Sequence, residues 1–89
     1  MPSILVHHQV KNYSEWKKGF DSSAPLRTRS GELSSNLYRS DSNPNDVTVI
    51  SKWDSLANAH KFAQSPELKA AMEKAGVEGI PSISFLNEA

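Results

Sequence analysis

Four short segments of the chain are rich in β-branched and aromatic residues and mix apolar with polar positions at a period of two. This pattern is typical of β-strands. The predicted strands are Ser3–Val10, Leu33–Arg39, Val47–Trp53 and Ile80–Leu86. Residues 41–46 between the second and third strands are all turn formers, so these two strands are expected to form a hairpin. Pro81 stands at the start of the fourth strand, where a missing backbone donor costs least.

Between the first two strands the apolar residues change to helical spacing. Asn12 or Ser14 can cap the free amides at the start of this helix, which carries Trp16 on its apolar stripe. Pro25 should interrupt the helix, because its ring removes one hydrogen bond and clashes with the preceding turn. We therefore expect a restart over residues 25–30.

A second helical region follows the third strand. It opens at Asp54 or Ser55, and it restarts at residues 65–67, where a serine cap precedes a proline and an acidic side chain. Gly76 marks its end. The element order is therefore βαββαβ. It predicts an α+β, ferredoxin-like fold over residues 1–89 as a single domain, with both helical regions on one face of a four-stranded antiparallel sheet.

The strands carry apolar side chains on both faces, although helices on one side would cover only one. Leu5 and Ile50 lie on the face opposite to most of their apolar neighbours. Apolar groups on both faces indicate that both faces are covered. The sheet is therefore predicted to pair with a second copy, giving a homodimer. The alternative is that these residues are half exposed, since much of any protein surface is apolar.

Composition narrows the function. Ten basic and ten acidic residues cancel without forming blocks, which argues against nucleic acid or an anionic membrane as partner. The chain has no cysteine, so it has no disulfide or thiolate metal site, and a cytoplasmic location is expected. The longest apolar stretch, residues 4–6, is far too short to span a membrane.

The histidines do not suggest a metal site. His7 and His8 are neighbours on a strand and point to opposite faces, so they cannot readily chelate one ion. One ring is expected to line the interior, where it could act as a general base, and the pattern does not say which. Tyr38 near the end of the second strand could bind a ligand. No nucleophile elbow or phosphate loop surrounds the serines.

One stretch of sequence carries a family resemblance. Trp53-Asp54-Ser55-Leu56-Ala57-Asn58-Ala59, followed by Phe62 and Ser65-Pro66-Glu67-Leu68, resembles the dimeric α+β-barrel superfamily. Within it, the chain is most similar to small proteins of the antibiotic-biosynthesis-monooxygenase and cyclase type. The resemblance implies a homodimer whose two sheets close face to face into a barrel, with a pocket in each subunit between sheet and helices.

Active members of that superfamily hold a reactive aromatic substrate or haem beside a tryptophan, and they use no conventional cofactor. The tryptophan corresponds to Trp53, whereas Phe62 stands where many members have a histidine three residues before the Ser-Pro pair. His60 lies about 200° around the helix from that position. The resemblance thus implies a pocket for a small hydrophobic or aromatic ligand. Its candidate residues are His7, Tyr38, Trp53, His60 and Phe62. Two functions remain open: a cofactor-independent monooxygenase or cyclase, and a non-enzymatic ligand-binding or stress-related dimer.

Overall fold

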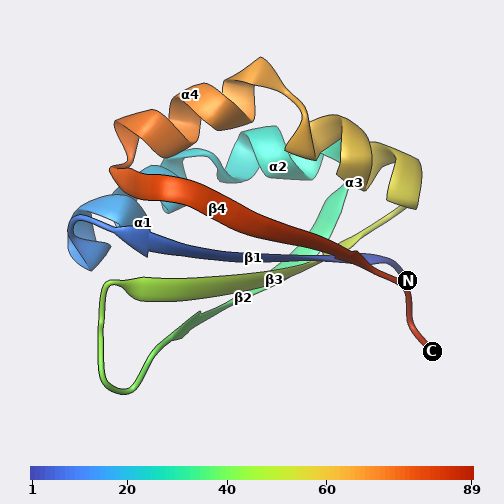
Figure 1. Ribbon diagram of the computed structural model, residues 1–89. Helices are drawn as coiled ribbons and strands as arrows, with labels where there is room; N and C mark the ends of the chain where they lie inside the picture. Colours follow the sequence, from blue (N-terminus) through green and yellow to red (C-terminus); the bar gives the residue numbers. More distant parts are fainter.

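The computed structural model describes residues 1–89 as one four-stranded antiparallel sheet covered on one face by four helices (Figure 1). The elements are β1 (Ser3–Val10), α1 (Tyr13–Ser22), α2 (Ala24–Ser30), β2 (Glu32–Arg39), β3 (Asp46–Trp53), α3 (Leu56–Ala63), α4 (Pro66–Lys74) and β4 (Val77–Leu86). The strand order is β2-β3-β1-β4. The predicted ferredoxin-like α+β fold and the β2–β3 hairpin are confirmed.

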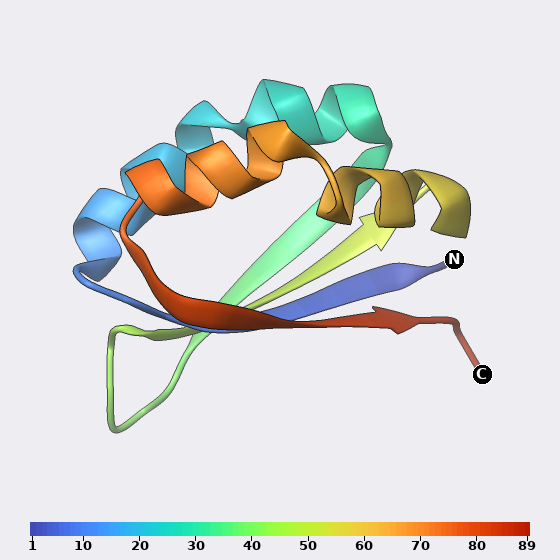
Figure 2. The same cartoon turned by 45° about the horizontal axis from the view of Figure 1, so that its top comes forward.

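Each predicted helical region is broken into two helices, and the capping residues explain where. The side chain of Asn12 accepts a hydrogen bond from the Glu15 amide at the start of α1, and Pro25 lies in the first turn of α2. Ser55 caps α3, and Ser65 caps α4 by accepting from the amide of Leu68. The helices form two rows, α1–α2 and α3–α4, side by side over the sheet (Figure 2).

The prediction that the fourth strand starts at Ile80 was wrong. β4 begins at Val77, which pairs with Val10, and a bulge then interrupts the ladder. His7 lies opposite Ser82 and Gln9 opposite Glu78, so residues 79–81 share a single partner position on β1. Gly79 has φ +68°, a conformation that glycine adopts without strain. Pro81 therefore lies inside an edge strand at a bulge rather than at its start, because a bulge leaves residues out of the ladder.

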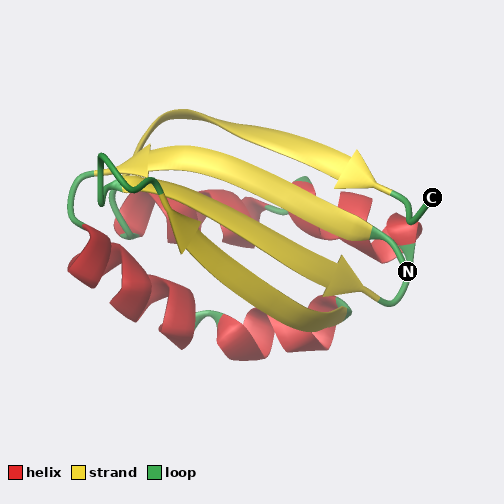
Figure 3. Cartoon of the chain, turned by 90° about the horizontal axis from the view of Figure 1, so that it is seen from below, coloured by secondary structure: helices red, strands yellow, loops and turns green.

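The two faces of the sheet have different surroundings. Alternate side chains of β1 enter the core beneath the helices; they are Ile4, Val6, His8 and Val10. The other face carries no helix (Figure 3). There Leu5 of β1 lies directly opposite Ile50 of β3, and both are half-buried. The predicted apolar residues on both faces are thus present, and the helix-free face exposes an apolar pair.

Candidate ligand-binding cavity

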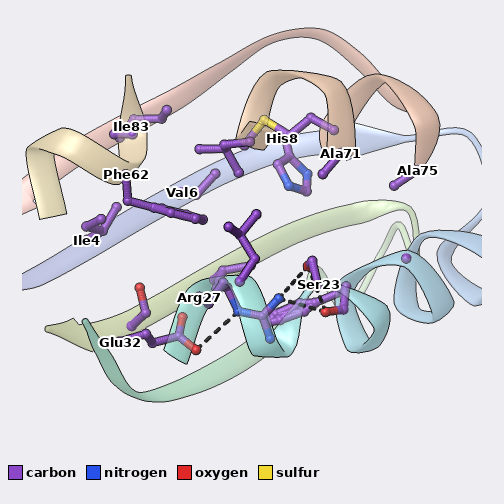
Figure 4. Close-up of a pocket in the computed structure, with 18 of the residues that line it drawn as sticks. Ile4, Val6, His8, Ser23, Arg27, Glu32, Phe62, Ala71, Ala75 and Ile83 are labelled. Carbon is purple, nitrogen blue, oxygen red and sulfur yellow. Dashed lines mark hydrogen bonds and ion pairs between the residues drawn. The ribbon is translucent and has the colours of Figure 1, made fainter. Parts of the chain in front are cut away.

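A cavity of about 90 Å³ lies between the sheet and the two helix rows (Figure 4). It divides the hydrophobic core into two clusters. One cluster is centred on Ile4, Trp53, Ala59 and Phe62, and the other on Val10, Trp16, Phe20 and Val47. Of the 20 residues that line the cavity, 14 are hydrophobic, so its interior suits an apolar molecule better than a charged one.

Small residues surround the cavity, which leaves the space unfilled. They are Gly19, Ser23, Ala63, Ala71 and Ala75 in the two helix rows and Ser51 on β3. Gly19 and Ala75 also let two helices meet, because a Cβ at position 19 would lie 3.0 Å from that of Ala75. This contact between α1 and the end of α4 lies in the wall of the cavity.

Aromatic rings form both ends of the cavity. At one end the centroids of Trp53 and Phe62 are 5.0 Å apart, and the indole Nε1 of Trp53 donates a 2.9 Å hydrogen bond to Ser51 Oγ. At the other end Trp16 and Phe20 lie 5.2 Å apart. The cavity therefore offers flat, apolar walls that are suited to a planar ring.

His8 is the buried polar group without a partner. It projects from β1 into the cavity lining and is 5% exposed, yet its Nδ1 makes no hydrogen bond (Figure 4). Its ring meets Trp16 edge-on, with centroids 5.4 Å apart. Burial lowers the pKa of His8 below its ordinary value, and the neighbouring His7 adds to this effect. At neutral pH the imidazole is therefore uncharged, with one nitrogen able to accept and one able to donate.

Arg27 and Glu32 form an ion pair in the lining of the cavity. Arg27 Nε donates to Glu32 Oε1 at 3.1 Å, and both side chains are largely buried. Nη1 of Arg27 donates to the carbonyl of Phe20 and to Ser23 Oγ, and the guanidinium stacks on the Phe20 ring, 3.6 Å from its centroid. Burial raises the pKa of Glu32, with the charge of Arg27 opposing. The two charges thus satisfy each other within the wall.

The structure brings only part of the predicted residue set together. Trp53 and Phe62 line the cavity, whereas His60 stacks on Phe85 at 3.8 Å and is absent from the lining. His7 and Tyr38 lie on the helix-free face. His7 Nε2 pairs there with Asp46 Oδ1, and Tyr38 is 54% exposed. Of the two neighbouring histidines, His8 faces the cavity.

Three polar residues of the lining differ in how far the sequence indicates them. His8 was one of two histidines of which one was expected to line the interior, and it continues the apolar set of Ile4, Val6 and Val10 at a period of two. Arg27 and Glu32 gave no such signal, because their meeting depends on the turn at Gly31 and on the irregular start of β2. Gly31 has φ +122°, which turns the chain sharply from α2 into the strand.

Nowhere do three histidine, aspartate or glutamate side chains lie close enough together to hold a metal ion. No helix combines the length and the apolar character needed to cross a bilayer. What the structure offers is a small, mostly apolar cavity with aromatic ends and one unpaired imidazole.

The four-stranded antiparallel sheet with helices and a cavity on one face makes this a ferredoxin-like α+β protein with a candidate ligand site. Residues 7–74 match the family profile described as antibiotic biosynthesis monooxygenase, and the chain belongs to that family. The resemblance inferred from the sequence is thereby confirmed. A comparison with curated protein sequences finds no match.

Solved structures share the fold at low sequence identity. An antibiotic biosynthesis monooxygenase homologue from Bordetella bronchiseptica has a TM-score of 0.80 at 19% identity, covering 99% of this chain and 96% of its own. SnoaB, a cofactor-independent oxygenase from Streptomyces nogalater, has a TM-score of 0.80 at 14% identity, with coverages of 99% and 92%. A protein from Caulobacter crescentus, described as being of the antibiotic biosynthesis monooxygenase type, has a TM-score of 0.77 at 20% identity, with coverages of 99% and 89%. At these identities the likeness concerns the fold alone.

Proposed function

We propose that this protein binds a small, electron-rich aromatic molecule in the cavity and oxidises it with dioxygen without a cofactor. One observation carries the proposal: an apolar cavity with aromatic ends contains a buried, uncharged imidazole whose Nδ1 has no hydrogen-bond partner within the protein. The fold shared with SnoaB, a cofactor-independent oxygenase, supports the same reading.

The proposed reaction needs only the substrate and dioxygen. The aromatic substrate supplies all four electrons that reduce O2. One oxygen atom forms a new carbonyl at a ring carbon, and the other leaves as water with two hydrogens taken from the substrate. The protein excludes bulk water and positions the ring. His8 is placed to accept a proton as electrons leave the substrate.

A second function, ligand binding without turnover, is supported by one feature of the same site. Arg27 and Glu32 are engaged with each other, and Phe62 stands where the resemblance implies a histidine. His8 therefore remains as the one unpaired ionisable side chain of the lining, and its lowered pKa makes it a weak base. Such a cavity could hold an aromatic ligand without activating it.

We further propose that the protein is a homodimer whose sheets face each other. Support comes from the Leu5–Ile50 pair, which is half-buried on a face that no helix covers. A monomer of 89 residues has a small core, here divided by a cavity, so burial against a second sheet would add to its stability.

The function is tested by offering hydroquinones, phenols and anthrones to the purified protein while oxygen uptake, product absorbance and thermal stability are followed. Ala71→Leu fills the cavity and should abolish both uptake and stabilisation. Ala70→Leu is the matched control, because Ala70 is the exposed neighbour on the same helix. Stabilisation without uptake would select the binding function, and uptake that persists in Ala71→Leu would contradict both.

A further inference from the structure

We propose that the ligand of this cavity is a neutral, single-ring phenol whose hydroxyl donates a hydrogen bond to His8. The inference rests on the proposed use of the cavity as a ligand site, and it is independent of whether the ligand is oxidised. Three properties of the cavity carry it: its size, the state of its charged groups and its unpaired nitrogen.

Size limits the ligand to one ring. The cavity measures about 90 Å³. For comparison, an apolar cavity of about 150 Å³ in another protein binds benzene. A single ring can therefore enter only if one wall moves slightly outward. A fused two-ring or three-ring molecule would need the two helix rows to separate.

Helix α4 is the wall that can move. None of its residues is buried, although Leu68, Ala71 and Met72 line the cavity. A groove between α4 and β4 lies on the outer side, and four residues line both spaces: Ala63, Leu68, Met72 and Ile83. The flexible Met72 side chain separates the two spaces, and a small outward shift of it would enlarge the cavity toward α4 by the volume that one ring requires. The groove itself measures about 540 Å³, so the one-ring limit applies while Met72 keeps the two spaces apart.

The charged groups exclude an ionic ligand. Arg27 already donates to Glu32, to the Phe20 carbonyl and to Ser23, so a ligand carboxylate would have to displace these partners. Glu32 forms an ion pair with Arg27, so it cannot bind a ligand ammonium without breaking that pair. Since His8 is uncharged at neutral pH, an ion in the cavity would have no free counter-charge.

The unpaired nitrogen selects a hydroxyl. A buried imidazole nitrogen without a hydrogen bond leaves the folded protein with an unmet polar group, which a ligand donor can satisfy. His8 lies at the aromatic end formed by Trp16, so a ring stacked in the cavity can place a substituent beside it. A phenol provides both parts, a flat apolar ring and one neutral donor.

The test uses four probes that separate these properties: phenol, toluene, benzoate and 1-naphthol. Binding to the full-length protein is followed by titration in amide NMR spectra at pH 7.5. Phenol should bind about 2- to 10-fold more tightly than toluene, because one net hydrogen bond distinguishes them. Benzoate and 1-naphthol should not shift the cavity amides. Equal affinities for phenol and toluene, or tighter binding of 1-naphthol, would overturn the inference.

Two variants assign the effect to named residues. In His8→Leu, which places an apolar group of similar size at this position, phenol should bind no more tightly than toluene, because its buried hydroxyl would have no partner. Ala71→Leu should block both, while Ala70→Leu should bind as the wild type does. A phenol preference that survives in His8→Leu would contradict the proposed hydrogen bond. Oxygen uptake is recorded separately, so phenol binding without uptake refutes the oxygenase function alone, and turnover of polycyclic substrates refutes the single-ring inference alone.

Discussion

Ser51 accepts the indole hydrogen bond of Trp53 from two positions earlier on the same strand, and both side chains are buried. Ser51→Ala removes this acceptor and leaves the indole N–H unpaired in an apolar wall. We expect the free energy of unfolding to fall by about 1–3 kcal/mol, measured by urea denaturation. Ser14→Ala is the control, since Ser14 is exposed in the first turn of α1, away from both the cavity and the helix-free face. Equal losses in the two variants would contradict the assigned role of Ser51.

The Arg27–Glu32 pair should behave as one unit. Arg27→Leu leaves Glu32 buried without its partner and should cost about 3 kcal/mol of unfolding free energy. Glu32→Leu should cost a similar amount for the converse reason. The double variant should lose much less than the sum, because no uncompensated charge remains. Additive losses in this double-mutant cycle would show that the two side chains act independently.

The stability of the ligand-free protein should depend on the titration of His8. The unfolded chain takes up a proton near the ordinary pKa of 6.5, whereas the folded protein does so only at lower pH. The free energy of unfolding should therefore be constant above that pKa and fall with a slope of at most about 1.4 kcal/mol per pH unit below it. Burial of Glu32 acts in the opposite sense, because its raised pKa favours the folded state only toward acid pH.

Comparison with His8→Leu separates the two groups. Glu32 is unchanged in this variant, so the difference between the wild-type and variant profiles isolates the histidine. His8→Leu should unfold with a shallower dependence on pH below 6.5. It should also be the more stable protein at neutral pH, since it replaces an unpaired buried polar group. Parallel profiles across this range would show that His8 does not carry the dependence.

The helix-free face can be tested through its apolar pair. Ile50→Lys places a charge directly opposite Leu5, and a buried charge without a partner opposes association. Sedimentation or native mass measurements at micromolar concentration should give a dimer for the wild type and a monomer for the variant. Lys61→Glu, on the exposed surface of α3, controls for the change of charge and should remain dimeric. A wild-type monomer would refute the proposed assembly.

Local signals were enough to predict most of the fold. Ser65 is the cap that was expected, Asn12 and Ser55 are caps that had each been one of two candidates, and Pro25 restarts the helix that it was expected to interrupt. Period-two patterns located β1 and β3 to within one residue. The start of β4 was missed because Gly79 and Pro81 belong to a bulge, where extra residues break the alternation from which a strand is read.

The site was harder to predict than the fold, because it depends on what is missing from the core. Trp53 and Phe62 could be placed from the sequence, but the space between the two core clusters arises from small residues on different elements. These small residues come together only when the chain has folded. Gly19 and Ala75, for example, are far apart in the sequence and meet only when α1 packs against the end of α4.

The bulge in β4 disfavours aggregation through the exposed edge of the sheet. β4 is an edge strand, and a straight edge with a row of free backbone donors can template a strand from another chain. Here Pro81 offers no N–H, Gly79 has a positive φ, and the 98% exposed Ile80 stands out from the ladder. The edge is thereby interrupted, which disfavours the growth of a continuous intermolecular sheet along it.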